Sequence, residues 1–166
     1  MSDVWKPSVT VAAIISRYQG AIQQFLMVEE TTTDGIRINQ AAGHLEPNES
    51  LQQAVIRETL EETAHDFKPT YLVGTYLSRF TSPTTGKQIT YLRFTFYGEL
   101  GQQHDQALDK GILRIMWMSY DELVASQERH RSPLVMQSIN DFLAGSRAPL
   151  SILNTHPSAL ENKISL

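Results

Sequence analysis

One helix-compatible stretch in the middle of the chain, with strand-like stretches before and after it, constrains the fold most. From Ser50 to Ala64 there is no glycine or proline, and Pro47-Asn48-Glu49 precedes this stretch as a helix start signal. Ser50 and Gln53 have the spacing of a capping box, in which each side chain bonds the backbone N–H of the other residue. We expect a helix over 50–64.

Strand patterns flank this helix. Val9 to Ile15 is an apolar, β-branched run typical of a buried strand. Phe25–Val28 follows a turn signal, which predicts a hairpin between these two strands. Further strands are predicted at Tyr71–Phe80, Ile89–Leu100 and Ile112–Met118, and short helices after Ser119 and from Ser132 to about Ala144. This mixture predicts an α/β or α+β domain with helices on both sides of a mixed sheet.

Length and composition exclude several classes of protein. The chain has 166 residues, 41% of them hydrophobic, which suits one domain over 1–150 and a tail over 151–166. The net charge of −4 argues against nucleic acid or an acidic membrane as the main partner. The absence of cysteine excludes a thiolate nucleophile or metal ligand. The first seven residues do not resemble a signal peptide, so we expect a cytoplasmic protein, as a monomer or a homodimer.

Glutamates gather on the predicted helix and in the loop before it. They are Glu46, Glu49, Glu58, Glu61 and Glu62. The last three follow at i, i+3 and i+4, so they share one helix face, and their mutual repulsion would be relieved by a hard cation such as Mg²⁺ or Mn²⁺. Ile56, Thr59, Leu60 and Thr63 lie opposite, and we expect that side to be buried. The alternative is a solvated acidic face without a ligand.

The spacing of these residues resembles the Nudix signature G-x5-E-x7-R-E-U-x-E-E-x-G-U, where U is a bulky aliphatic residue. Six of its seven fixed letters are present, at Gly43, Glu49, Arg57, Glu58, Glu61 and Glu62. Ala64 replaces the last glycine, and Thr59 and His65 replace aliphatic residues. A residue just past a helix often adopts a left-handed conformation that is costly for alanine, so the helix exit is expected to be strained.

The resemblance implies a Nudix α/β/α sandwich and a function for each matching residue. Glu58, Glu61 and Glu62 would be the metal ligands, together with the carbonyl of Gly43. Arg57 would pair with Glu49 and hold the loop against the helix. Glu58, Glu61 and Arg57 would thus form the catalytic centre. The general base stays open between Glu61, Glu99 and Asp109.

Segments outside the signature resemble a bacterial subgroup, the NudJ-type Nudix phosphatases. They include Lys6–Ala12, Val28–Thr31, Asn39–Glu46, Leu92–Phe94, Arg131–Val135 and Gly145–Leu150. This resemblance implies Mg²⁺-dependent release of phosphate from nucleoside di- and triphosphates and from small pyrophosphates such as that of the thiamine pyrimidine precursor. The alternatives are a pyrophosphohydrolase of dinucleoside polyphosphates, ADP-ribose or RNA 5′ ends, and a non-catalytic Nudix-fold ligand sensor.

An anionic small-molecule substrate needs positive side chains. We expect Arg93, Arg37 and Arg131 to bind it, and Arg93 first, because it lies between apolar neighbours on a predicted strand. Tyr91 or Phe80 could stack on a base, although aromatic side chains in strands are more often core residues.

Overall fold

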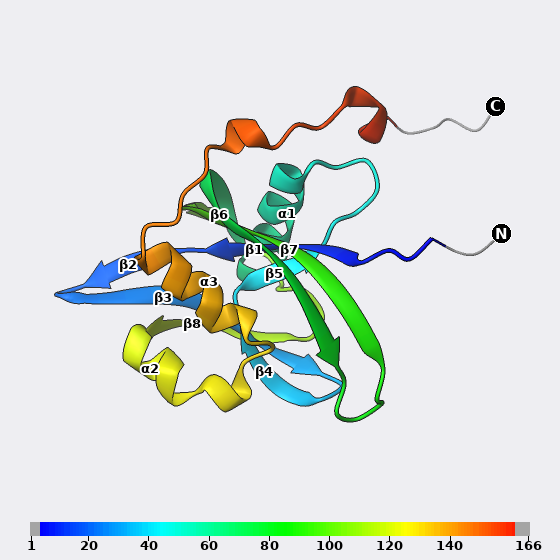
Figure 1. The fold of residues 1–166 in the computed structure, drawn as a ribbon. Helices are drawn as coiled ribbons and strands as arrows, with labels where there is room; N and C mark the ends of the chain where they lie inside the picture. Colours follow the sequence, from blue (N-terminus) through cyan, green and yellow to red (C-terminus); the bar gives the residue numbers. More distant parts are fainter. Residues whose placement is uncertain (1–3, 162–166) are drawn as a thin grey trace.

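The structure, a computed structural model, describes residues 4–161; the first three residues and the last five of the predicted tail lie outside this range. Figure 1 shows its elements. The strands are β1 (Ser8–Ile14), β2 (Ser16–Gln19), β3 (Ile22–Thr32), β4 (Gly35–Asn39), β5 (Ala41–His44), β6 (His65–Thr81), β7 (Gln88–Gln103) and β8 (Ile112–Ser119). The helices are α1 (Leu51–Thr63), α2 (Tyr120–Ala125) and α3 (Leu134–Leu143), with short 3₁₀ turns η1 (Gln127–Arg129), η2 (Leu150–Ile152) and η3 (Pro157–Ala159).

The strands form two sheets. The first has the order β5-β1-β7-β6, and in the second β3 pairs with β2, β4 and β8. β1 and β7 run parallel and the other pairs are antiparallel, so the first sheet is mixed. The expected α/β or α+β domain with a mixed sheet is confirmed, as an α+β fold.

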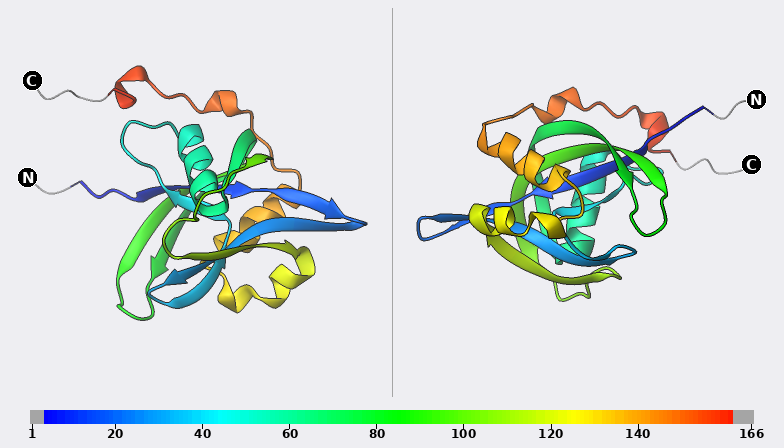
Figure 2. Two further views of the ribbon diagram at one scale, coloured as in Figure 1. Left: turned by 180° about the vertical axis from the view of Figure 1, so that it is seen from behind. Right: turned by 60° about the horizontal axis from the view of Figure 1, so that its bottom comes forward.

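Alternating strand residues build two hydrophobic layers. Val11 and Ala13 of β1 pack into a cluster with Ala54 and Val55 of α1, whereas Ile14 packs into a second cluster. That second cluster contains side chains of α2 and α3, namely Leu123, Val135, Met136 and Ile139. Because successive strand residues point to opposite faces, helices cover both sides. Figures 1 and 2 show α1 on one side and α2 with α3 on the other.

The predicted hairpin between the first two strands is wrong. β1 lies between β5 and β7 in the first sheet, and it is the short β2 that pairs with β3 in the second. The chain passes from one sheet to the other at Ile15, whose carbonyl still accepts a hydrogen bond from Leu26 N–H. Because Ile15 continues the apolar run without a glycine or proline, the sequence pattern carries no sign of this transfer.

Both capping boxes form. Ser50 caps α1 and bonds reciprocally with Gln53, as expected, and Ser119 caps α2 with Glu122. Ala64 ends α1 at φ 57°, ψ 29°, in the left-handed region. Its N–H bonds to Leu60 carbonyl, and β6 starts at the next residue. The expected strain at the helix exit is therefore present in the backbone.

The buried face of α1 differs from the expected one. Ile56 is 38% exposed, whereas Glu58 and Glu62 are each only 8% exposed. The small side chains of Ala54 and Val55 face the first sheet, and the same helix face then carries Glu58 and Glu62 against β5. The expected burial opposite the carboxylates is therefore right for Thr59 and Thr63, which are 0% and 1% exposed, and wrong for Ile56. Glu58 and Glu62, expected on the other face, are themselves buried.

Residues after α3 pack on the domain. Ala148 and Leu72 of β6 bond through their backbones, and Leu150 and Leu153 pack against the cluster that contains α1. Within residues 4–161, no helix is both long and apolar enough to cross a membrane.

Candidate active site

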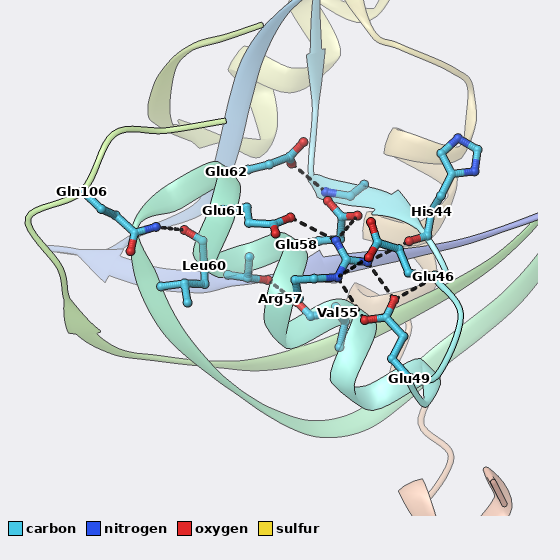
Figure 3. Close-up of polar contacts among 12 residues, drawn as sticks. His44, Glu46, Glu49, Val55, Arg57, Glu58, Leu60, Glu61, Glu62 and Gln106 are labelled. Atoms are coloured by element: carbon cyan, nitrogen blue, oxygen red, sulfur yellow. Dashed lines mark hydrogen bonds and ion pairs between the residues drawn. The ribbon is translucent and has the colours of Figure 1, made fainter. Parts of the chain in front are cut away.

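Arg57 connects helix α1 to the loop before it (Figure 3). Its Nε and Nη2 donate to the two carboxylate oxygens of Glu49 at 2.9 and 2.7 Å, and Nη2 also donates to His44 carbonyl at 2.9 Å. Burial alone would raise the pKa of Glu49, but the bonds from Arg57 and from Glu46 N–H hold it below its ordinary value. This two-pronged pair fixes the loop against the helix.

The remaining guanidinium nitrogen of Arg57 reaches two helix carboxylates. Nη1 donates to Glu58 at 2.8 Å and to Glu61 at 3.0 Å. The Glu58 carboxylate lies against Gly43, where an added Cβ would come within 2.1 Å of its carboxyl carbon. A side chain at position 43 would have to displace this carboxylate, so glycine lets the Glu58 carboxylate lie beside bare backbone.

Glu62 is as deeply buried as Glu58. It accepts a hydrogen bond from Ala42 N–H at 2.9 Å. Burial raises the pKa of Glu62 to about 8; the Ala42 bond opposes this, and the charges of Glu30, Glu58 and Asp109 add to it. The pKa of Glu58 is also raised by burial, against the opposing effect of Arg57. A nearby cation would therefore stabilise the charged form of both carboxylates.

The segment after β7 crosses the C-terminal end of α1. His104 N–H and Asp109 N–H donate to the carbonyls of Ala64 and Glu61, at 2.7 and 2.9 Å. Gln106 Nε2 donates to Leu60 carbonyl at 3.1 Å (Figure 3). These bonds satisfy helix-end carbonyls and bring Asp109 to the carboxylates. Glu99, in contrast, is exposed on β7 opposite Lys68.

The chemistry of the carboxylates suits a hard divalent cation, although the side chains do not form a complete set of metal ligands. Among residues 4–161, no three acidic, histidine or cysteine side chains converge as a metal site, and Arg57 bridges Glu58 and Glu61. Oxygen donors, burial and mutual repulsion are nevertheless the properties that favour Mg²⁺ or Mn²⁺. At Gly43 any side chain would displace the Glu58 carboxylate from its place beside β5.

A cavity of about 390 Å³ opens beside β5. It is lined by Thr10, Glu30, Asn39, Ala42, Gly43, His44, Leu77, Ser78, Arg79, Phe80, Tyr91, Arg93, Arg131, Ser132, Pro133, Leu134 and Gln137. Ala42 and Gly43 are the residues that contact Glu62 and Glu58, so the cavity adjoins the carboxylates. Tyr91 and Phe80, suggested as stacking residues, both line it.

Two of the three arginines expected to bind substrate lie at this cavity. Arg93 is 5% exposed and its Nη2 donates to Asn39 Oδ1 and Gln40 Oε1 at 3.3 and 3.0 Å. Arg131 lines the opening and approaches Glu30 to 3.9 Å. Arg37 is not in the lining and its Nη1 donates to Glu128 carbonyl at 3.4 Å.

Sequence reasoning missed the polar residues that surround Arg93. Glu30, Asn39 and Gln40 were not candidates, although all three lie within segments that resemble the NudJ-type group. The available signal was the pair of adjacent amides, Asn39 at the end of β4 and Gln40 in the link to β5. In the structure both are buried. Buried amides need partners, and here a buried arginine supplies one.

Comparison with known proteins agrees with this geometry. The NUDIX domain family matches residues 6–138. Phosphatase NudJ of Escherichia coli K12 is 35% identical over 155 residues, covering 90% of this chain and 92% of that protein. A NUDIX hydrolase from Nitrosomonas europaea superposes with a TM-score of 0.81 at 49% identity, covering 91% of this chain and 98% of its own. A UDP-X diphosphatase, at 19% identity and a TM-score of 0.66, shares the fold.

Buried carboxylates on α1 beside a cavity lined by arginines suit the hydrolysis of phosphorylated compounds. The chain belongs to the Nudix family, and phosphoanhydride bonds are its class of substrate bond. The family and the similarity to NudJ-type phosphatases expected from the sequence are confirmed.

Proposed function

We propose that this protein is a Mg²⁺-dependent phosphatase, with Mn²⁺ as a possible substitute. Its substrates would be nucleoside di- and triphosphates and small pyrophosphates such as that of the thiamine pyrimidine precursor. One observation carries the proposal: Glu58 and Glu62 contact Gly43 and Ala42, and these two residues also line the cavity. A phosphate in the cavity would therefore lie next to both carboxylates.

Glu58, Glu61 and Glu62, with the Gly43 carbonyl, would hold the cation. When bound, the cation would neutralise charge on the phosphate oxygens and so make phosphorus more open to attack. Arg57 would fix the orientation of Glu58 and keep the loop around Glu49 closed on the helix.

Arg93 and Arg131 would bind phosphate oxygens from the cavity side, and Arg37 remains a prediction for longer substrates. A water oxygen would form a bond to phosphorus while the bridging P–O bond breaks, and a carboxylate would accept the water's proton. Glu61 and Asp109 are the acids that lie near Glu58 and could do so.

The test is a substrate panel with Mg²⁺, with products identified by phosphorus NMR. Orthophosphate from a nucleoside di- or triphosphate is the expected product. A nucleoside monophosphate with pyrophosphate would instead indicate a pyrophosphohydrolase, and no Mg²⁺-dependent turnover of any phosphoanhydride would contradict the proposal. Glu62→Gln serves as the matched control, because it keeps the shape of the side chain and removes its charge.

A further inference from the structure

The guanidinium of Arg93 is buried in the cavity wall with most of its donors unused. Only Nη2 makes hydrogen bonds to the residues of the described range, and Nε has no partner. Both acceptors, on Asn39 and Gln40, are neutral amide oxygens. Burial lowers the pKa of Arg93 only to about 10, so the group is charged at neutral pH. A buried charge without an opposing charge in contact is costly unless a ligand completes it.

Asn39 keeps the nearest cavity acid apart from this cation. Its Nδ2 donates to Glu30 at 3.3 Å, and its Oδ1 accepts from Arg93 at 3.3 Å. Glu30 therefore bonds to the amide and pairs loosely with Arg131 at 3.9 Å instead of binding the Arg93 guanidinium. Glu30 and Glu62 thus stabilise the positive charge of Arg93 only from a distance, and the hydrogen bonds of its guanidinium go to neutral amides.

Gln40 fixes the other side of the guanidinium. It is 1% exposed, and its Nε2 donates to Val135 carbonyl and Ser138 Oγ of α3, at 3.0 and 3.2 Å. These two acceptors orient the amide so that its oxygen must face Arg93. The Gln40 amide thus links the Arg93 guanidinium to helix α3.

We propose that Arg93 forms a subsite for an anionic phosphate oxygen of the substrate, and that Asn39 and Gln40 are positioning residues that hold its guanidinium for this purpose. This inference rests on the proposed function and names the contact within it. An anion is favoured over a neutral carbonyl of a base, because only an anion supplies the charge that Arg93 lacks.

The first test observes Arg93 directly. Its Nε–H is sealed from solvent, so its ¹H–¹⁵N resonance is expected to be visible in the metal-free, ¹⁵N-labelled protein and is assigned by its loss in Arg93→Lys. Inorganic pyrophosphate should shift this resonance in a saturable manner, whereas uridine, a neutral nucleoside with carbonyl groups, should not. Absence of a shift with pyrophosphate would overturn the subsite, and a shift with uridine alone would assign Arg93 to the base.

The second test examines positioning. Gln40→Met removes all three hydrogen bonds of the amide, and Gln40→Glu keeps the shape but places a carboxylate beside Arg93. Each should weaken pyrophosphate binding and raise KM about tenfold with little change in kcat, since hydrogen bonds to charged groups are worth about that much. The matched control is Gln24→Met, which breaks an exposed bond of the same chemistry from Arg17 Nε at 3.1 Å.

Wild-type affinity for pyrophosphate in folded Gln40→Met or Gln40→Glu protein would overturn the positioning assignment. If neither variant folds, the wild-type titration still decides the subsite. Hydrolysis of phosphoanhydrides without a shift of the Arg93 resonance would refute this inference alone, whereas a shift without hydrolysis would refute the proposed function alone.

Discussion

Gly43 and Glu58 show how a single atom can control the site. A Cβ at position 43 would overlap the flexible end of the Glu58 side chain at 2.1 Å, with no backbone atom among its nearest contacts. Gly43→Ala should therefore leave the fold intact and displace the carboxylate. We expect kcat/KM to fall about 100-fold, the usual effect of misplacing a catalytic group by about 1 Å, with a nearly unchanged melting temperature. Full activity of Gly43→Ala would contradict the contact.

Ala64 holds a backbone conformation that β-branched residues rarely adopt. At φ 57°, the Cβ already crowds the following carbonyl, and a second branch would worsen this contact. Ala64→Val should lower the free energy of unfolding by about 2 kcal/mol, measured by urea denaturation. The control is Ala64→Gly, which accepts this φ without strain. A valine variant as stable as the glycine variant would argue against a left-handed helix exit.

Local spacing predicted some residues well and missed others for a physical reason. The Arg57–Glu49 contact and the strained Ala64 were implied by the Nudix resemblance, and the Ser50–Gln53 box follows from positions close in sequence. The burial of Glu58 and Glu62 does not, because it depends on which side of α1 meets β5, a contact between distant segments. Periodicity placed three carboxylates on one face but could not say that this face was buried.

At the scale of elements, Glu29 ties β3 to its neighbours. It is 8% exposed and receives Arg114 Nε of β8 at 2.8 Å, together with Nη2 of Arg129 in η1. The Arg114 bond is the largest effect on Glu29, and with Arg129 it outweighs burial and holds the pKa of the carboxyl below 4.5. The folded protein therefore favours the charged carboxylate.

The direction of this pKa shift determines how the stability of the protein depends on pH. Because the pKa of Glu29 is lowered by folding, its contribution is present above the unfolded value of 4.5 and is lost as the pH falls through the folded value. Glu29→Gln should lower the free energy of unfolding by about 1 kcal/mol at neutral pH, a modest value because both arginines are partly exposed. Urea unfolding near pH 7 and in acid measures it. If Glu29→Gln were less stable than the wild type by the same amount in acid, the stabilisation by Glu29 would not be ionic.

Elements were easier to predict than their partners. Every strand-like stretch of the sequence became a strand, although β6 and β7 run further than expected because they pair with each other along most of their length. The assignment of β1 to the first sheet and β3 to the second was missed, since both read as buried apolar runs. Choice of sheet depends on long-range pairing, which an alternating pattern does not encode.

At the scale of the whole molecule, the cavity forms where segments far apart in sequence meet. β1, β3, β5, β6, β7 and the start of α3 all contribute lining residues. A single residue such as Arg93 could be predicted as a site residue from its apolar neighbours. That Arg131 shares its cavity and Arg37 does not depends on the packing of the whole chain.

The proposed domain boundary near residue 150 can be tested by truncation. Leu150 and Leu153 pack against the main hydrophobic cluster, so a chain ending at Pro149 would expose part of it. We expect the truncated protein to fold but to be less stable by about 2 kcal/mol, since both side chains are only half buried. Thermal and urea unfolding of the two lengths measure the difference. An unchanged stability would show that residues after 149 form a separate tail.

We propose above all that Glu58 and Glu62 hold a divalent cation and that hydrolysis requires it. Titration with Mn²⁺, with the free ion followed by electron paramagnetic resonance, tests this most directly and needs no substrate. The wild-type protein should bind Mn²⁺ saturably and release it to Mg²⁺. Glu58→Gln and Glu62→Gln should each bind at least about tenfold more weakly, since even outer-shell changes cost that much, while Glu161→Gln, an exposed acid far along the chain, should match the wild type. Wild-type Mn²⁺ affinity in both Glu58→Gln and Glu62→Gln would contradict the account.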